Sequence, residues 1–464
     1  MADAFDVVVI GAGPAGEHLA GRLADGGLSV ALVERELIGG ECSYWGCIPS
    51  KTLIRPGDVL AAARRAPGAA EAVTGRLDAA AAFAQRDYMT SGWNDAGQLP
   101  WLREKGIELV RGSGRLAGER VVEVDGDAGR RLHAARAVVL ATGTRPLVPP
   151  VDGLREEQTR PWDNRTATEA KDVPRRLLVL GGGAVGVELA QGFRRLGAEQ
   201  VTIVEGAERL LAREEPFAGE EVRAAFEAEG MVVITGARMQ AAGRRGADGP
   251  VLASLRDGRR LEADEILVAV GRRPATDGIG LETVGLEPGR PVAVDERLRA
   301  VGVDGGWLYA IGDCNGRAPF THMGKYHGRV AASVILGGDA VDRASDLALP
   351  RVTFTDPQVC AVGLTEAQAR DRGLDVTVVT TPTGGVPGAY VQGNDINGTS
   401  QLVIDDARRV VVGATFTGPG LQELLHSATV AVVTEAPLER LWHAVPSFPT
   451  VSEVWLNLLE AYGL

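Results

Sequence analysis

The chain has 464 residues, 45% of them hydrophobic, and a formal net charge of −12 at pH 7. This length predicts about three domains, and the acidic balance argues against nucleic acid or an anionic membrane as partner, because both attract basic surfaces. The apolar runs are shorter than the ~18–20 residues that span a bilayer, and strand-like sequence begins within about five residues of the first methionine, which leaves no room for a signal peptide. The sequence therefore predicts a cytoplasmic globular protein.

A glycine-rich nucleotide-binding motif follows the first predicted strand. Residues 6–10 are apolar and lead into Gly11-Ala12-Gly13-Pro14-Ala15-Gly16, a helix-like stretch and a second strand that ends at Glu34. In such a unit the first glycine permits a tight turn, the second lets a pyrophosphate approach the backbone, and the third lets helix and strand pack closely. The acid at the strand end is placed to accept hydrogen bonds from a ribose. We expect a dinucleotide here.

Two of the four cysteines, Cys42 and Cys47, stand close together directly after this unit. In a chain without an export signal, such a pair is more often catalytic or metal-binding than structural. Zinc would normally need four ligands, and Cys314 and Cys360 are isolated. The spacing favours a redox-active dithiol over a structural or metal role. A helix opening at Pro49 would favour the thiolate of Cys47.

A second glycine motif lies in the middle of the chain. Helical sequence over 53–103, strands over 110–124 and 136–141 and a proline-rich boundary precede it. The motif Gly181-Gly182-Gly183-Ala184-Val185-Gly186 follows a strand over 177–180, and the next strand ends at Glu205. A carboxylate at this position repels a 2′-phosphate and favours NAD over NADP, although Arg209 and Arg213 lie nearby.

The last part of the chain changes character. Strands over 262–270 and 307–311 are followed from about residue 347 by alternating strands and then by two amphipathic helices over 421–434 and 451–461. This order predicts a separate α+β domain. The expected fold class is therefore α/β, with two Rossmann-like dinucleotide-binding domains and a C-terminal α+β domain.

The motifs together resemble those of the FAD-dependent pyridine nucleotide–disulfide oxidoreductases, a family that includes lipoamide dehydrogenase, glutathione reductase and mercuric reductase. The resemblance covers nearly the whole chain and rests on GAGPAG at 11–16, GGECSYWGCIPSK at 39–51, ATG at 141–143, GGGAVGVE at 181–188, VGRRP at 270–274, IGDC at 311–314 and VTFTDPQVCAVGLTEAQA at 352–369. It implies an FAD-binding domain in two parts (1–150 and 276–346), an NAD(P)-binding domain (151–275) and a dimerisation domain (347–464).

The resemblance also implies roles for individual residues. Electrons would pass from NADH, or secondarily NADPH, through FAD to a Cys42–Cys47 disulfide, with Cys47 against the flavin and Cys42 as the exchanging thiol. Lys51 would reach the flavin and pair with Glu188, and Glu453 would act at the interface of a homodimer. The implied FAD contacts are Gly11, Gly13, Gly16, Glu34, Gly40, Lys51, Ala141, Thr142, Gly143, Gly312 and Asp313, and the implied NAD contacts are Gly181, Gly183, Gly186, Glu205 and Gly271.

One departure from the family pattern concerns proton transfer. The family's disulfide reductases carry His-Pro-Thr-x-x-Glu near the C-terminus, where the histidine is the acid/base for the outer thiol, and this chain has Phe448-Pro449-Thr450-Val451-Ser452-Glu453. Phenylalanine transfers no proton, and such a step contributes roughly 10²–10⁴-fold. We interpret His443, five residues upstream, as a surface or interface histidine. Mercury is disfavoured as substrate, because the C-terminus lacks the extra cysteines that hand over this metal.

Three functions stay open at this stage. The first is an enzyme that uses the dithiol to reduce a disulfide or a thiol-reactive species such as a metal ion, with a leaving group that needs no histidine. The second is an NAD(P)H:quinone or dye reductase in which the flavin serves the acceptor directly. The third is a flavin-dependent redox sensor.

Overall fold

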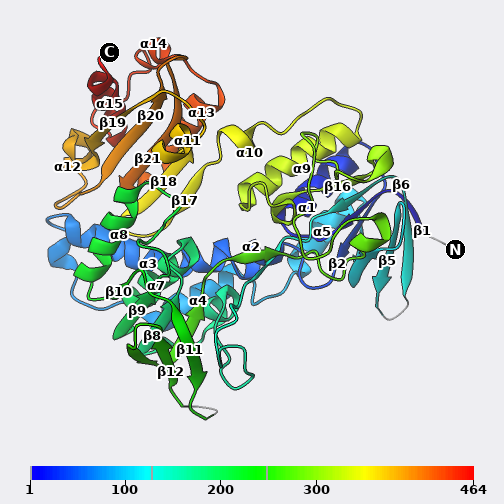
Figure 1. The fold of residues 1–464 in the computed structure, drawn as a ribbon, viewed down its shortest axis with the longest axis horizontal. Coiled ribbons are helices and arrows are strands. Elements are labelled where there is room, and N and C mark those ends of the chain that lie inside the picture. Colours follow the sequence, from blue (N-terminus) through cyan, green and yellow to red (C-terminus); the bar gives the residue numbers. More distant parts are fainter. Residues whose placement is uncertain (1–2, 127–128, 247–248) are drawn as a thin grey trace. The chain divides into compact units, whose positions relative to one another are not determined.

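The chain folds into two units, each with its own sheets (Figure 1). A computed structural model describes residues 3–126, 129–246 and 249–464. The first unit contains Met1–Pro49, Arg86–Pro146 and Arg272–Ser345, and the second contains Ser50–Gln85, Leu147–Gly271 and Asp346–Leu464. The division into four segments made from the sequence stays a prediction.

The first unit is built on a parallel sheet that continues into antiparallel strands. Its strands are near-continuous apolar runs, as expected where both faces of a sheet are covered; Val7, Val8 and Val9 are fully buried. The order is β3-β2-β1-β6-β5-β4, and β16 also pairs with β6. The bounds are β1 Asp3–Ile10, β2 Val30–Glu34, β3 Glu108–Arg111, β4 Ser113–Leu116, β5 Val121–Asp125, β6 Arg130–Leu140 and β16 Leu308–Ala310; a separate ribbon pairs β7 Thr144–Pro146 with β15 Arg272–Pro274.

Two helices of this unit, α1 (Pro14–Asp25) and α9 (Thr321–Ile335), lie side by side (Figure 1). Glycines make this approach possible. A Cβ on Gly324 would lie 3.2 Å from Ala15 Cβ, and one on Gly328 would lie 3.1 Å from the carbonyl oxygen of Ala15. Larger residues would push the helices apart.

Several predicted elements are shorter than expected. The stretch over 53–103, which the sequence predicts to be helical, contains three helices: α3 Cys47–Arg65, α4 Ala79–Met89 and α5 Leu99–Lys105, separated by loops and short 3₁₀ turns. The predicted strand over 110–124 divides into β3, β4 and β5, because Gly112 (φ 140°) and Gly118 (φ 105°) reverse the backbone. Helix α3 begins at Cys47, two residues before Pro49.

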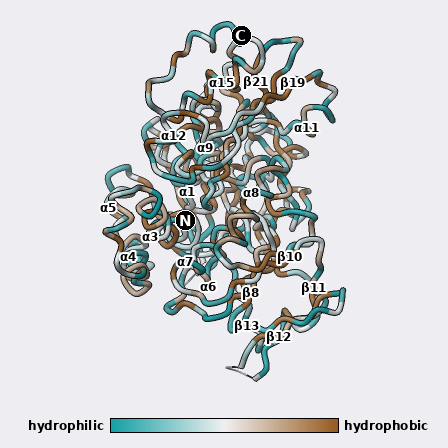
Figure 2. Tube along the Cα trace, turned by 90° about the vertical axis from the view of Figure 1, so that its left-hand side faces the viewer, coloured by the Kyte–Doolittle hydropathy of each residue, from teal (hydrophilic) through white to brown (hydrophobic). Residues whose placement is uncertain are grey.

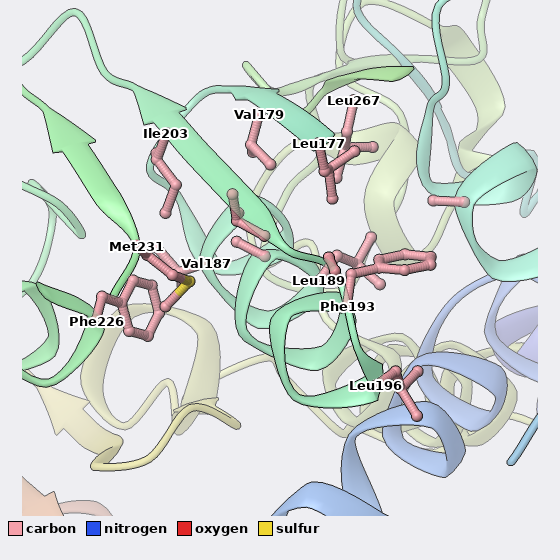
Figure 3. Close-up of a cluster of buried hydrophobic side chains, with 14 of the residues drawn as sticks. Leu177, Val179, Val187, Leu189, Phe193, Leu196, Ile203, Phe226, Met231 and Leu267 are labelled. Atoms are coloured by element: carbon pink, nitrogen blue, oxygen red, sulfur yellow. The ribbon is translucent and has the colours of Figure 1, made fainter. Parts of the chain in front are cut away.

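The second unit contains a four-stranded parallel sheet in the order β10-β9-β8-β14 and a three-stranded antiparallel sheet, β11-β12-β13. Figure 3 shows Leu189 and Phe193 of α7 on the side of the helix that faces Leu177 and Leu267 of the parallel sheet. Hydrophobic residues run along β8 and β10 in Figure 2. The bounds are β8 Arg176–Leu180, β9 Gln200–Val204, β10 Val232–Ile234, β11 Met239–Arg244, β12 Val251–Leu255, β13 Arg260–Ala263, β14 Glu265–Val268, α6 Asn164–Glu169, α7 Ala184–Leu196 and α8 Pro216–Ala228.

A five-stranded antiparallel sheet in the order β17-β18-β21-β20-β19 completes the second unit. Helix α13 packs on β18 and β21, and α15 packs on β19 and β20, which is the strand-then-helix arrangement expected from the sequence. The bounds are β17 Arg351–Thr353, β18 Gln358–Gly363, β19 Val376–Pro382, β20 Thr399–Asp405, β21 Val410–Gly418, α10 Ala344–Leu347, α11 Glu366–Asp371, α12 Pro387–Tyr390, α13 Leu425–Val433, α14 Leu438–Leu441 and α15 Val454–Tyr462. Within the described ranges no helix combines the length and hydrophobicity that crossing a bilayer requires.

Candidate active site

The first glycine motif forms a backbone cradle at the end of β1. Gly11 has φ +105°, and a Cβ there would lie 2.4 Å from the carbonyl oxygen of Ala141. A Cβ on Gly16 would lie 2.0 Å from the carbonyl oxygen of Gly11. Around Gly13 the ideal Cβ position has no atom within 4 Å, so the second glycine faces open space at the start of α1. This is the geometry that lets a pyrophosphate approach a helix N-terminus.

The carboxylate of Glu34 holds this cradle in shape. It is buried and accepts hydrogen bonds from the backbone N–H groups of Ala12 (2.8 Å) and Glu36 (2.7 Å). The contact with a ribose that the sequence implies stays a prediction; each carboxylate oxygen has a further lone pair available for it.

Polar groups around the same cradle fit FAD. The hydroxyl of Thr142 is buried and has no hydrogen-bond partner among the described residues. The carboxylate of Asp313 accepts a hydrogen bond from the Thr144 hydroxyl at 3.0 Å, and burial raises its pKa. Gly143 and Gly312 both have positive φ, and a Cβ on Gly143 would have no atom within 4 Å. A buried orphan hydroxyl beside an open glycine cradle matches the needs of a polar cofactor.

The second glycine motif repeats the cradle in the second unit. A Cβ on Gly181 would lie 2.5 Å from the carbonyl oxygen of Ala269, one on Gly186 would lie 2.1 Å from that of Gly181, and Gly183 has no atom within 4 Å. Glu205 accepts hydrogen bonds from the backbone N–H groups of Gly182 (2.5 Å) and Ala207 (2.7 Å). Gly271, at φ +135°, also faces open space.

Arg209 and Arg213, which lie near Glu205 in the sequence, differ in their surroundings. Arg209 donates to the carbonyl oxygens of Ala212 and Glu214, at 3.1 and 3.3 Å. Arg213 is exposed. The Arg209 side chain is therefore partly engaged by its own loop.

The cysteine pair is held against the first cradle. Cys42 lies in α2 (Gly40–Tyr44), and Cys47 is the first residue of α3. A Cβ on Gly40 would lie 2.8 Å from the Cα of Gly13, so only a glycine lets this loop approach the glycine motif so closely. This close approach is a physical reason for the Gly39-Gly40 pair before the cysteines.

Cys42 and Cys47 form no disulfide in this structure, and both residues are half-buried. The pKa of the Cys42 thiol is raised, first by its hydrogen bond to Cys47 and then by burial; the Thr321 hydroxyl and the positive charge of Lys325 act against this rise. The Thr321 hydroxyl lies 3.4 Å from Cys47 Sγ. Helix α9 therefore supplies both a hydroxyl and a cation to the dithiol.

A polar chain connects the dithiol motif to Asp313. Glu41, next to Cys42, forms an ion pair with Arg272. Arg272 Nε donates to Thr144 Oγ1 at 2.7 Å, and that hydroxyl donates to Asp313. The pairing of β7 with β15 brings Thr144 and Arg272 together.

Lys51 and Glu188 form an ion pair in the second unit. Lys51 Nζ lies 2.6 Å from Glu188 Oε2, and the other carboxylate oxygen accepts the backbone N–H of Phe354 at 2.9 Å. Glu188 is buried, whereas the side chain of Lys51 is 34% exposed. The lysine nitrogen also lies 4.9 Å from the centre of the Phe354 ring, within cation–π range.

The segment with the missing histidine is exposed. Phe448 is 74% exposed, and His443 is exposed and packs edge-on against Trp442, with ring centroids 4.8 Å apart. The Glu453 Oε2 atom is buried without a hydrogen-bond partner among the described residues. These residues belong to the second unit and both redox cysteines to the first. The role of Glu453 stays a prediction.

Sequence reasoning missed Thr321, Phe354 and the part played by Arg272. Arg272 stands in a recognised motif, but nothing in the sequence pairs it with Glu41. Thr321 and Phe354 act through contacts with residues 274 and 166 positions away. The two isolated cysteines are buried: burial raises the pKa of Cys314 to about 11 and raises that of Cys360. Among the described residues no group of three or more metal-binding side chains is present.

Two glycine cradles, a dithiol on one of them and a lysine–glutamate pair near the other define a flavin- and nicotinamide-linked oxidoreductase. Residues 5–328 match the model of the pyridine nucleotide-disulphide oxidoreductases, and residues 349–459 match the dimerisation domain of that family. The chain belongs to this family, whose members use FAD and NAD(P)H. The fold class and the family resemblance inferred from the sequence are thereby confirmed.

The relatives have several activities. The chain is 31% identical to a mercuric reductase of Staphylococcus aureus, over 97% of this chain and 81% of the relative. It is 34% identical to a dihydrolipoyl dehydrogenase of Thermus scotoductus, over 98% and 97% of the two chains. Among solved structures, the copper(II) complex of the HOCl-induced flavoprotein disulfide reductase RclA from Escherichia coli superimposes with a TM-score of 0.86 at 26% identity, over 99% of both chains.

Proposed function

We propose that this protein is a homodimeric, cytoplasmic reductase that takes electrons from NADH and delivers them, through Cys42 and Cys47, to a disulfide or a thiophilic metal ion. The observation that carries the proposal is the position of the dithiol: Gly40 packs on Gly13, and Thr321 contacts the Cys47 sulfur. When bound, FAD accepts hydride from the nicotinamide and supplies two electrons to a disulfide.

The chain's own residues divide the remaining work. The two cradles bind the pyrophosphates, and Glu205 favours NADH over NADPH. Lys51 is held by Glu188 as a fixed cation. The Cys42 thiol attacks as its thiolate and breaks the S–S bond of the acceptor. Cys47 then attacks Cys42, the internal disulfide forms, and two thiols leave with two electrons and two protons. With copper, the same two electrons reduce two Cu(II) ions to Cu(I) and two protons leave the dithiol.

The metals named for two of the relatives support a thiophilic acceptor. Mercuric reductases and a copper(II)-bound RclA are similar to this chain. Phe448 at the histidine position favours an acceptor whose leaving group departs without a proton. The same observation supports a second candidate, direct reduction of a quinone by the flavin.

An anaerobic titration with NADH tests the proposal. If two electrons give a long-wavelength charge-transfer band without bleaching the flavin, a cysteine thiolate lies against oxidised FAD and the dithiol is in the electron path. Cys42→Ser and Cys47→Ser should then abolish turnover of disulfides and copper(II). If both variants retain turnover and the flavin bleaches directly, the quinone reductase is the better assignment.

A further inference from the structure

One histidine of the first unit is completely enclosed by protein. Of the six histidines, all within the described ranges, His327 alone is buried. Its side chain is 0% exposed, as is that of the neighbouring Asp342. It lies in the middle of α9. Because a buried imidazole is costly unless both ring nitrogens have partners, the groups around the ring indicate what it does.

The two ring nitrogens of His327 face different groups. Nδ1 accepts a hydrogen bond from the backbone N–H of Gly312 at 3.2 Å, and the side-chain nitrogen of Asn315 lies 3.4 Å from the same atom. Nε2 lies 2.9 Å from Ser345 Oγ and 3.5 Å from Asp342 Oδ2. A ring nitrogen that accepts from an N–H carries no proton, so the neutral ring has its proton on Nε2, directed at the hydroxyl and the carboxylate.

This group of serine, histidine and aspartate is not a nucleophilic triad. A triad places the serine on one ring nitrogen and the carboxylate on the other, whereas Ser345 and Asp342 here share Nε2. Burial acts to raise the pKa of Asp342, but its contacts with His327 and Ser345 keep that pKa below its ordinary value. Arg317 Nε also lies 3.3 Å from the carboxylate. An ionised carboxylate beside Nε2 holds the ring in the tautomer that leaves Nδ1 free to accept.

The segment that His327 holds is the 3₁₀ turn η5 (Gly312–Asn315), on which α9 packs. Gly312 has φ +69° at the start of this turn. Asp313 follows directly, and both residues are predicted from the sequence to contact FAD. The imidazole therefore fixes the first N–H of a turn whose next side chain is a candidate cofactor ligand.

We propose that His327 is a positioning residue for FAD: its Nδ1 lone pair holds the turn that carries Asp313, and Asp342 keeps this lone pair available by holding the proton on Nε2. The family uses FAD. Without the acceptor, the N–H of Gly312 loses its buried partner and the turn is no longer held where it meets the cofactor. This role concerns retention of FAD and is independent of the acceptor that the enzyme reduces.

Two substitutions of His327 separate the acceptor from the packing. In His327→Asn the side-chain oxygen takes about the place of Nδ1 and can accept from Gly312, whereas His327→Leu fills the space without an acceptor. Release of FAD from the purified holoenzymes in concentrated potassium bromide is followed by the rise in flavin fluorescence, and the fold by far-UV circular dichroism. We expect His327→Leu to release FAD about 10-fold faster than the wild type before the fold is lost, and His327→Asn to stay within about 3-fold of the wild type.

Asp342→Asn tests the tautomer with almost no change in side-chain volume. The asparagine amide can donate to Nε2, which permits the tautomer whose Nδ1–H opposes the N–H of Gly312, so FAD release should again accelerate. This variant decides the question if His327→Leu does not fold. Val330→Ala, a buried residue on the same helix, is the packing control and should lose stability without releasing FAD ahead of unfolding. Equal release rates from His327→Asn and His327→Leu, or release no faster than wild type from Asp342→Asn, would overturn the proposal.

Discussion

The two nucleotide cradles have almost the same backbone but differ in the helices that leave them. A Cβ on the first and third glycines would lie 2.4 and 2.0 Å from a backbone carbonyl oxygen in the first cradle, and 2.5 and 2.1 Å in the second. In each cradle a glutamate at the end of the second strand accepts hydrogen bonds from backbone N–H groups of the loop. His18 and Glu188 each stand two residues after the third glycine. Glu188 is paired with Lys51, whereas His18 lies among unpaired cations. The glycine spacing thus determines the cradle, and the helix face determines which charges stand beside it.

Helix α7 is also held by a set of polar side-chain contacts. Gln191 exchanges hydrogen bonds with the backbone of Asp356, at 2.8 and 3.0 Å. Arg195 binds Asp58, Glu229 and Asp356. With Glu188, these side chains fix α7 to α3 and to the loop after β17. These contacts hold in place the helix that carries Glu188, the partner of Lys51.

The largest expected effects come from the glycines. Gly16→Ala and Gly186→Ala place a Cβ against a backbone carbonyl in both cradles, and we expect each to reduce the free energy of unfolding by about 3 kcal/mol or to prevent folding. Chemical denaturation measures this. Gly13→Ala and Gly183→Ala are the matched controls, since their Cβ atoms meet open space. They should fold normally and lose FAD and NADH binding, respectively. Equal loss of both ligands in either control would contradict the assignment of one dinucleotide to each cradle.

Replacement of the paired helix residue should have a moderate effect. Glu188→Gln leaves Lys51 without its carboxylate, and because this lysine is one-third exposed we expect a loss of only about 1 kcal/mol in stability. Flavin reduction by NADH, followed by stopped-flow absorbance, should slow measurably. His18→Gln at the equivalent position breaks no ion pair and should change stability by less than about 0.5 kcal/mol. If the two substitutions prove equivalent, the contrast between α1 and α7 has no energetic basis.

Substitutions of the two strand-end glutamates should affect different ligands. Glu205→Gln removes the charge that repels a 2′-phosphate, so the ratio of kcat/KM for NADH to that for NADPH should fall about 5- to 10-fold. Glu34→Gln should weaken FAD retention and leave this ratio unchanged. A ratio unaffected by Glu205→Gln would assign the selectivity to the neighbouring arginines.

How far the sequence predicts the structure depends on the range of the interaction. Both cradles, the strand ends at Glu34 and Glu205 and the dithiol were located from the sequence, because glycine spacing and short cysteine spacing are local patterns. The predicted ends of helices and strands are less accurate where a glycine interrupts an apolar run, as Gly112 does between β3 and β4. The Thr321–Cys47 contact and the Glu41–Arg272 pair follow from tertiary packing, which no local pattern encodes. The packing of α1 on α9 at Gly324 and Gly328 follows from tertiary packing as well, because the two helices lie far apart in the sequence.

The smallest predicted effect is a difference in how the two regions respond to pH. Burial raises the pKa of Glu17 from 4.5 to about 7, with Lys325 opposing the rise and Glu34 adding to it; Tyr44 is the other titratable group that Glu17 faces. The folded protein therefore binds a proton at pH values where the unfolded chain has released it. This contribution to stability is present below pH 4.5 and is lost as the pH rises through about 7.

Glu17→Gln should consequently stabilise the protein at pH 8, by up to about 1 kcal/mol after allowance for solvent screening, and gain little at pH 5. Asp58, next to Arg195, is the corresponding carboxyl in the second region, and burial raises its pKa to about 6. Asp58→Asn should therefore change the pH dependence of stability in a window about one pH unit lower than that of Glu17→Gln. Thermal denaturation of both variants between pH 5 and pH 8 measures the two windows. If the stability of Glu17→Gln follows that of the wild type at both pH 5 and pH 8, the raised pKa of Glu17 makes no contribution to folding.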